Sequence, residues 1–242
     1  MSGATLVRRR GFSFKSFLWL GVVLWVLFLV VPLNDWARHW EYAQALQFCV
    51  YVFVVPALLV LSSLHSRPTS GTSVADSETD AKRRYTSARA RWVVLTILMI
   101  VSDVVWRLSP VVDALVHHSW LDVIEALCLA LVGVLFWREL LAPFEAAGTP
   151  DPLFRLVMAT FVVWSIWIMA YLAGLSGGSW YHAFHHQAGH GLSLTADQQI
   201  STAVMWSLSA CAFLPVIFFN LARWLGSEKD ARDSRHHFTR SQ

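Results

Sequence analysis

The histidines between residues 176 and 197 are the side chains of this sequence whose type and spacing best suit metal chemistry. The segment reads SGGSWYHAFHHQAGHGLSLTAD, has no Lys or Arg, and holds His182, His185, His186 and His190. If it is helical, their spacing brings the imidazoles to one face. Imidazole suits copper and zinc, and copper binds more tightly. Two interpretations stay open: a copper site, or a polar surface loop.

A ligating imidazole must be neutral, so copper binding here is expected to weaken below about pH 6. Replacing His185 and His186 with Ala is expected to lower the copper content. Glu125, His117 and His118 are further candidate metal ligands, held in reserve.

Charged residues inside apolar runs form a second group of candidates. Asp103 and Arg107 are four residues apart, a spacing that suits an ion pair on one helical face. Charges within a membrane are normally paired or functional, so both a structural pair and a site stay open. Glu125 has no partner four residues away. It is either a cation ligand or a partner of Arg107 across the bundle.

The start of the last apolar run has the pattern of a helix N-terminus. Thr195 and Gln198 have the spacing of a capping box, and Asp197 falls where the helix dipole favours negative charge. This motif therefore has a structural explanation, and a functional surface at the outer membrane face stays open as a second interpretation.

The composition defines the elements that must position these residues. Of the 242 residues, 56% are hydrophobic and only 14% charged, and the mean hydropathy is +0.49. Soluble domains carry about 25% charged residues. The chain also has 13 Trp, a residue that gathers at bilayer interfaces. These values exclude a disordered chain, a disulfide-rich secreted domain and an ordinary soluble enzyme.

We therefore predict an all-α, polytopic helical membrane protein. A membrane span needs about 20 apolar residues in a helix. The six stretches of this kind are Ser16–Asn34, Tyr42–Leu64, Trp92–Pro110, Ser119–Trp137, Leu156–Leu175 and Gln198–Ala222.

The distribution of basic residues predicts the orientation, because cytoplasmic segments accumulate Lys and Arg. With the N-terminus inside, only Arg38 and Arg107 of the 19 Lys and Arg residues fall outside. Both termini are therefore expected in the cytoplasm. The predicted organisation is a basic N-terminus (1–15), two spans (16–64), a flexible cytoplasmic loop (65–91), four spans (92–224) with the outer loop 176–197, and a cytoplasmic tail (225–242).

Most histidines fall in outer loops or at outer helix ends, and none lies in the middle of a predicted span. Axial haem ligands would have to project into the bundle. No haem is therefore expected.

The C-terminal half resembles the multi-span CtaG family of cytochrome c oxidase assembly proteins over residues 136–206. The elements that carry the resemblance are Phe136-Trp137, Trp180-Tyr181, Gly191-Leu192-Ser193, Asp197-Gln198-Gln199 and Met205-Trp206. The run Pro56-Ala57-Leu58-Leu59 gives weaker similarity.

The sequence departs from the family at three intramembrane positions. Members usually have two histidines four apart in the second span and another near the start of the fourth. Here those positions hold Gln44, Phe48 and Ala126 or Glu125. The added histidines of the outer loop are not a family pattern.

The resemblance implies a role in building a haem-copper terminal oxidase by delivering or seating copper. The first hypothesis is thus a copper-handling, non-enzymatic assembly factor of the bacterial cytoplasmic (inner) membrane, with oxidase subunits and lipid as partners and no nucleic acid. The second is a non-catalytic accessory subunit of a respiratory or copper-containing complex. A membrane oxidoreductase is a third, opposed by the missing mid-membrane haem ligands and nucleophile–base pairs.

Overall fold

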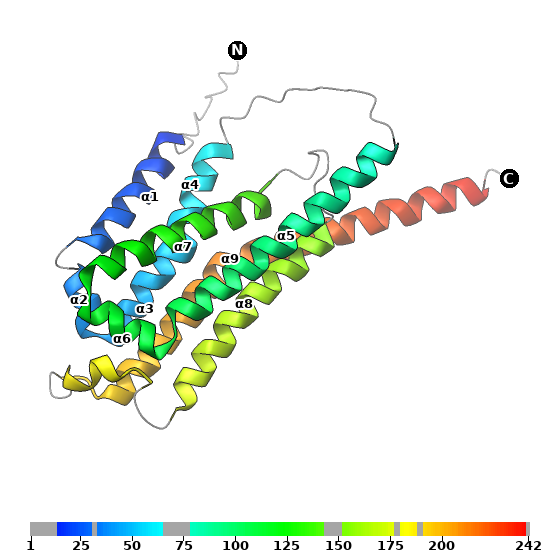
Figure 1. The fold of residues 1–242 in the computed structure, drawn as a ribbon. Helices are drawn as coiled ribbons and strands as arrows, with labels where there is room; N and C mark the ends of the chain where they lie inside the picture. Colours follow the sequence, from blue (N-terminus) through cyan, green and yellow to red (C-terminus); the bar gives the residue numbers. More distant parts are fainter. Residues whose placement is uncertain are drawn as a thin grey trace, which may run out of the picture.

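All regular structure in the described residues is helical, which confirms the all-α prediction (Figure 1). The computed structural model describes residues 14–30, 33–64, 78–142, 152–176, 180–187 and 191–240. The elements are α1 (Phe14–Leu29), α2 (Leu33–His39), α3 (Glu41–Cys49), the π-helix η1 (Val50–Val54), α4 (Val55–Leu64), α5 (Glu78–Trp106), α6 (Ser109–His117), α7 (Ser119–Leu140), α8 (Pro152–Leu175), the 3₁₀-helix η2 (His182–Gln187) and α9 (Leu194–Arg240).

Each predicted span has a counterpart among these helices. Four continuous helical segments are long and apolar enough to cross a membrane: Glu41–Ser63, Ser119–Leu140, Pro152–Leu175 and Leu194–Gly226. The first and third predicted spans are bent pairs, α1 with α2 and α5 with α6. Counting each bent pair as one span gives the six that the sequence predicts.

Two boundaries differ from the prediction. The helix of the third span begins at Glu78 rather than Trp92, so the second half of the predicted loop 65–91 is helical. The last helix continues to Arg240, through most of the predicted tail 225–242. Residues 65–77 lie outside the described part of the chain.

The bend between α5 and α6 has a local cause at Pro110, which has no backbone N–H and cannot continue the hydrogen-bond ladder of α5. The chain turns at Arg107, whose N–H donates to the Val104 carbonyl at 3.1 Å. Pro110 then lies in the first turn of α6, where no intrahelical donor is needed. The two helices meet at 63°.

The long segment from α3 to α4 is distorted in its middle by η1. Pro56 lies two residues after the end of η1 and again removes a backbone donor. The Val55 N–H donates to the Val50 carbonyl, five residues back, in the π-helical pattern. This bulge brings Val52 and Pro56 against Gly133 of α7.

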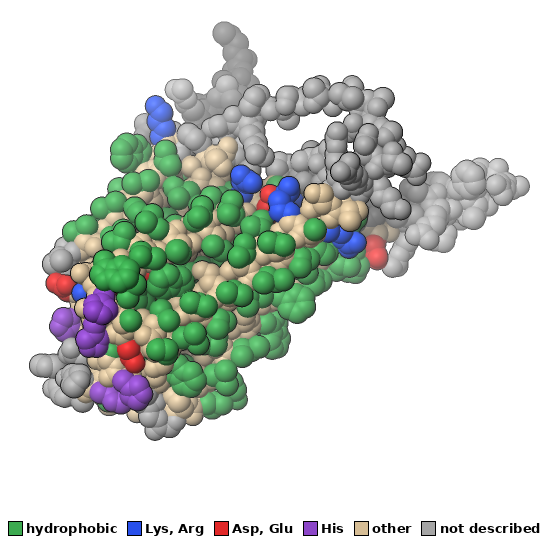
Figure 2. Space-filling model, in the orientation of Figure 1, with side chains coloured by type: hydrophobic (Ala, Val, Ile, Leu, Met, Phe, Trp, Pro, Cys, Tyr) green, Lys and Arg blue, Asp and Glu red, His purple; other side chains and the backbone are tan. Residues whose placement is uncertain are grey.

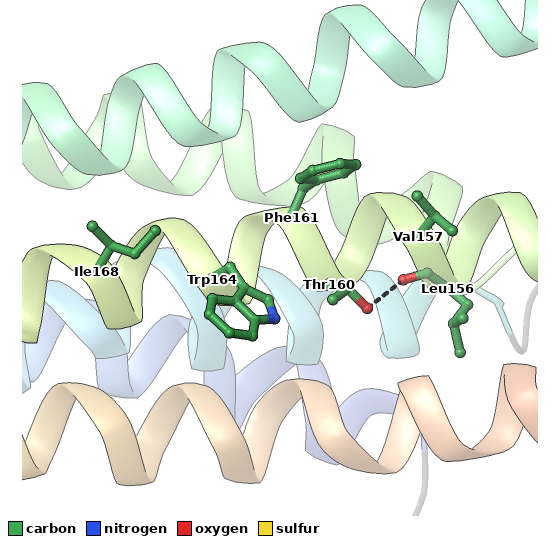
Figure 3. Close-up of a pocket in the computed structure, with 6 residues that line it drawn as sticks. All are labelled: Leu156, Val157, Thr160, Phe161, Trp164 and Ile168. Atoms are coloured by element: carbon green, nitrogen blue, oxygen red, sulfur yellow. Dashed lines mark hydrogen bonds between the residues drawn. The ribbon is translucent and has the colours of Figure 1, made fainter.

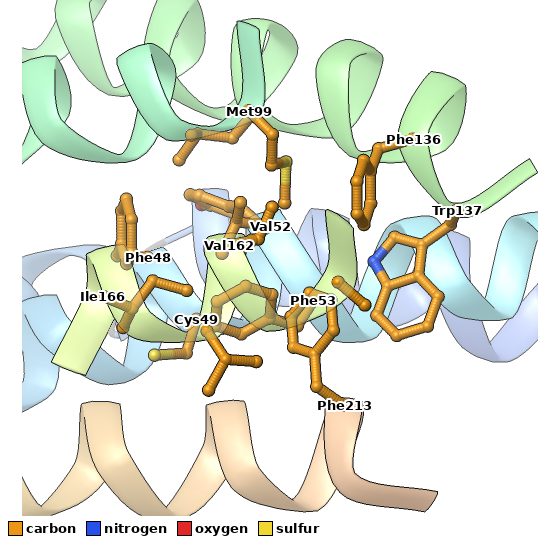
Figure 4. Packing of buried hydrophobic residues seen from close by; sticks show 14 of the residues in the cluster. Phe48, Cys49, Val52, Phe53, Met99, Phe136, Trp137, Val162, Ile166 and Phe213 are labelled. Atoms are coloured by element: carbon orange, nitrogen blue, oxygen red, sulfur yellow. The ribbon is translucent and has the colours of Figure 1, made fainter. Parts of the chain in front are cut away.

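The core of the bundle is built from aromatic side chains of η1, α5, α7 and α9 (Figure 4). Phe213 stacks on Trp137, with ring centroids 5.0 Å apart, and meets Phe53 edge to face at 5.4 Å. The ring centroids of Trp92 and Phe136 lie 5.9 Å apart. These contacts hold in place the helices whose polar residues lie at the two ends of the bundle.

Candidate functional site

The described histidines gather at one end of the molecule, whereas Lys and Arg side chains lie mainly at the other (Figure 2). This histidine end is formed by α2, α6, η2 and the first turns of α7 and α9 (Figure 1). Its histidines are His39, His117, His118, His182 and His185. The described histidines and most of the described Lys and Arg residues thus lie at opposite ends of the molecule, and the side of the membrane that each end faces stays a prediction.

His182 and His185 form an imidazole pair on η2. A 3₁₀-helix has three residues per turn, so side chains three apart are eclipsed. Both side chains are exposed, and their ring centroids lie 5.2 Å apart with the planes at 73°. His186 also belongs to η2, but its side chain lies outside the described part, as does the whole of His190.

The imidazole pair is held against α6 by two side chains. Asp113 accepts a hydrogen bond from the Ala183 backbone N–H at 2.9 Å. Ser109 donates its hydroxyl proton to the Trp180 carbonyl at 3.0 Å. Phe184 packs beneath η2 against Val112 of α6. The 3₁₀ turn therefore has a fixed base while its imidazoles face outward.

Tyr181, the residue before η2, connects this 3₁₀ turn to the interior of the bundle. Its hydroxyl donates to the backbone carbonyl of Arg107 at 3.2 Å. Burial raises the pKa of the Tyr181 phenol to about 12, so the hydroxyl stays protonated and remains a donor at neutral pH. Its ring also covers the Arg107 guanidinium, 5.0 Å from the ring centroid.

The predicted capping box at the start of α9 is wrong. Helix α9 begins at Leu194, so its cap is Ser193, whose Oγ accepts the Ala196 N–H at 3.1 Å. Thr195 is exposed. Gln198 instead accepts the Trp180 N–H at 3.1 Å and donates to the Ser176 hydroxyl at 2.7 Å.

Asp197 also acts beyond its own helix. Its two carboxylate oxygens accept the backbone N–H groups of Glu41 and Tyr42, each at 2.9 Å. These donors open α3, whose own cap residue Trp40 supplies no side-chain hydrogen bond. Asp197 therefore caps a helix more than 150 residues away in sequence, through contacts at separations of 155 and 156.

The reserve ligands do not join the imidazole pair. Nδ1 of His117 lies 2.6 Å from the Asp113 carbonyl oxygen. The ring centroids of His118 and Trp120 lie 6.5 Å apart. Glu125 is buried inside the bundle. Among the described residues, no group of three or more His, Cys, Asp or Glu side chains is arranged to hold a metal ion. The described residues thus offer a metal ion a pair of exposed imidazoles, His182 and His185.

Arg107 lies at the centre of a buried polar cluster with Gln44, Glu41 and Glu125. Its Nη1 donates to the Gln44 side-chain oxygen. Its charge also acts on the carboxyl groups of Glu41 and Glu125. All four side chains are at most 3% exposed. One carboxyl oxygen of Glu125 has no hydrogen-bond partner among the described residues, so its pairing with Arg107 stays a prediction.

The predicted ion pair between Asp103 and Arg107 is wrong. The i, i+4 spacing applies only within a helix, and α5 ends at Trp106 before Arg107. The two carboxylate oxygens of Asp103 are buried and accept no hydrogen bond from the described residues. The Arg107 side chain turns instead toward α3 and the ring of Tyr181.

The positions at which the sequence departs from the CtaG pattern meet at this arginine. Gln44 accepts its hydrogen bond, and the centroid of the Phe48 ring lies 5.6 Å from its guanidinium carbon. A guanidinium stays protonated in proteins. The interior site thus contains its own cation, which opposes the binding of a metal ion there.

Comparison with protein families shows to which family the chain belongs. The family model described as cytochrome c oxidase caa3 assembly factor matches residues 2–227. The chain belongs to this family. Comparison with curated proteins and with solved structures gave no match.

Membership extends beyond the residues that suggested it, from 136–206 to most of the chain. The family-like residues are mainly structural here: Met205 lies in the core, and Trp206 stacks on Trp167 of α8 with centroids 4.9 Å apart. Gln199 is exposed at the histidine end. Trp180 and Tyr181, with Gln198, fix the start of the outer turn.

Asp113 and Ser109 are the functional-site residues that the sequence analysis missed. Both lie on α6 and hold the backbone around η2. The available signal was the Ser-Pro step at residues 109 and 110, which is typical of a helix start. Their partners about 70 residues away could not be inferred from spacing.

Proposed function

We propose that this chain holds copper at the outer face of the bacterial cytoplasmic membrane and passes it to a haem-copper terminal oxidase during assembly. Family membership supports the assembly role. The observation that carries the copper step is the exposed pair His182 and His185, with ring centroids 5.2 Å apart on a braced 3₁₀ turn.

The chemistry of the pair suits transfer rather than storage. Imidazole is a ligand that copper accepts readily. Two imidazoles from the protein leave coordination positions for ligands of a partner, so copper can move by ligand exchange with no change in its oxidation state. The exposed position of both rings gives a partner direct access.

The interior of the bundle is unfavourable for a copper ion, and this supports a copper site at the imidazole pair instead. Gln44 and Phe48, two of the intramembrane positions at which the sequence departs from the family's histidines, contact the guanidinium of Arg107. A copper ion there would face a fixed positive charge in a region of low dielectric constant. The outer imidazole pair carries no such cost.

The proposal is tested in cells that lack this chain and are complemented with variants. The wild-type chain is expected to restore the copper content and activity of the terminal oxidase. The double variant His182→Ala/His185→Ala is expected to leave both at least about tenfold lower at limiting copper, since even indirect support of a metal ligand is worth that much. Added copper should partly restore them.

His39→Ala is the matched control, because His39 is another exposed histidine of the same end, whose Nδ1 contacts the Asp35 carbonyl of its own helix. Full complementation by the double variant would refute the copper site. A normal oxidase in cells without the chain would refute the assembly role. Stoichiometric co-purification with a mature oxidase would favour the accessory-subunit hypothesis.

A further inference from the structure

A long apolar groove runs along the exposed side of α8. It has a volume of about 490 Å³ and is lined by Leu156, Val157, Thr160, Phe161, Trp164 and Ile168 (Figure 3). The Thr160 hydroxyl donates to the Leu156 carbonyl of its own helix at 2.8 Å, so its polarity is satisfied internally. The groove therefore suits an apolar occupant.

The shape and position of the groove match one lipid chain. From Leu156 to Ile168 the helix rises roughly 18 Å at 1.5 Å per residue. One leaflet contributes about half of a hydrocarbon core that is roughly 30 Å thick. Phe161 and Trp164, each 56% exposed, lie three residues apart on the same face of α8 and border the groove (Figure 3). The groove starts at the end of the molecule that is rich in Lys and Arg.

A fixed cation lies at this end of the groove. The Arg89 guanidinium carbon is 4.8 Å from the ring centroid of Phe154, in the first turn of α8, and 5.2 Å from that of Tyr85. Arg89 is exposed, and no carboxylate of the described residues pairs with it. Arg91, by contrast, is bound to Glu139 at 2.8 Å.

We propose that this groove and Arg89 form a binding site for an anionic phospholipid of the cytoplasmic leaflet. One acyl chain lies along α8 between Phe161 and Trp164, and the headgroup phosphate binds the Arg89 guanidinium. Arginine matches phosphate through paired N–H donors, and the two aromatic rings hold its side chain in place before the lipid arrives. The charge at one end and the apolar length together distinguish this groove from an ordinary lipid-facing surface.

The test is native mass spectrometry of the full-length purified protein with phosphatidylglycerol and with phosphatidylcholine of the same acyl chains. The wild-type protein is expected to retain phosphatidylglycerol preferentially. Arg89→Gln should reduce that preference about fivefold, the factor expected for one basic residue near an anionic headgroup. Trp164→Ala should weaken retention of both lipids.

Arg138→Gln is the matched control, since Arg138 is an exposed arginine of the same end on α7, a helix that does not line the groove. Equal retention of the two lipids by the wild-type protein would overturn the proposal, as would equal effects of Arg89→Gln and Arg138→Gln. A change of oligomeric state in Trp164→Ala would show that a protein helix occupies the groove instead. All three substitutions replace exposed side chains, and an unchanged thermal unfolding midpoint verifies that each variant is folded.

Discussion

Arg107, at the start of the α5–α6 turn, makes structural contacts through both its backbone and its side chain. Its backbone carbonyl accepts the Tyr181 hydroxyl, and its guanidinium donates to Gln44 and lies over the rings of Phe48 and Tyr181. Buried charges are tolerated only when they are paired and hydrogen-bonded. Arg107 therefore stabilises the interior polar cluster and anchors the outer turn through its backbone.

Replacing Arg107 with Ala is expected to lower the free energy of unfolding by about 1–3 kcal/mol, because the buried Gln44 side chain would lose the hydrogen bond from the guanidinium. Thermal unfolding in detergent, followed by tryptophan fluorescence, measures the effect. The exposed Arg138→Ala provides the comparison and should change the free energy by no more than about 0.5 kcal/mol. If both variants unfold at the wild-type temperature, Arg107 has no such structural role.

At the level of elements, the contact between η1 and α7 depends on the absence of a side chain at Gly133. A Cβ atom at this position would lie 2.6 Å from Pro56 Cγ and 3.0 Å from the Val52 carbonyl oxygen. Neither atom belongs to a flexible chain end, because Pro56 is a ring and Val52 contributes backbone. The π-helical bulge and Gly133 therefore fit together as one packing unit.

Gly133→Ala is expected to destabilise the protein by about 1–3 kcal/mol, since an added methyl group forces η1 and α7 apart. Gly226→Ala is the control. Its Cβ would meet no atom within 4 Å, and alanine favours the helix there by about 0.5–1 kcal/mol. Unfolding midpoints of the two variants should move in opposite directions. A shift in the same direction would contradict the close packing at Gly133.

The elements were largely predictable from the sequence, and their partners were not. Charge-free stretches determine the spans because a bilayer excludes unpaired charge, so every predicted span has a helical counterpart. The break at Pro110 falls at the end of a predicted span for a local reason. The role of Asp197 as the cap of α3 depends on a contact between residues 155 apart, and no local spacing encodes it.

The imidazole pair was partly predictable for the same reason. His182 and His185 lie three apart, so any helical turn brings them together, and the 3₁₀ form does so most directly. The position of Arg107 was not predictable, because the i, i+4 rule assumed that α5 continues past Trp106. Tertiary packing against Gln44 and Tyr181 decides where its guanidinium lies.

At the scale of the whole molecule, the two ends differ in chemistry (Figure 2). The two arginines predicted to lie outside are both held within the fold: Arg38 pairs with Asp122, and Arg107 is buried. The exposed imidazoles lie at this end of the molecule, while exposed arginines such as Arg89 and Arg91 lie at the other end. This polarity suits a membrane protein that meets copper on one side and anionic lipid on the other.

The most direct test of the account is the copper content of the full-length protein, purified in mild detergent after loading with copper and washing. The wild-type chain is expected to retain copper in stoichiometric amount, and His182→Ala/His185→Ala to lose it, with His39→Ala unchanged. Retention should fall as the pH drops below about 6, because protonated imidazole cannot bind the metal. Copper retained equally by the double variant, or by none of the proteins, would contradict the claim that η2 is the copper site.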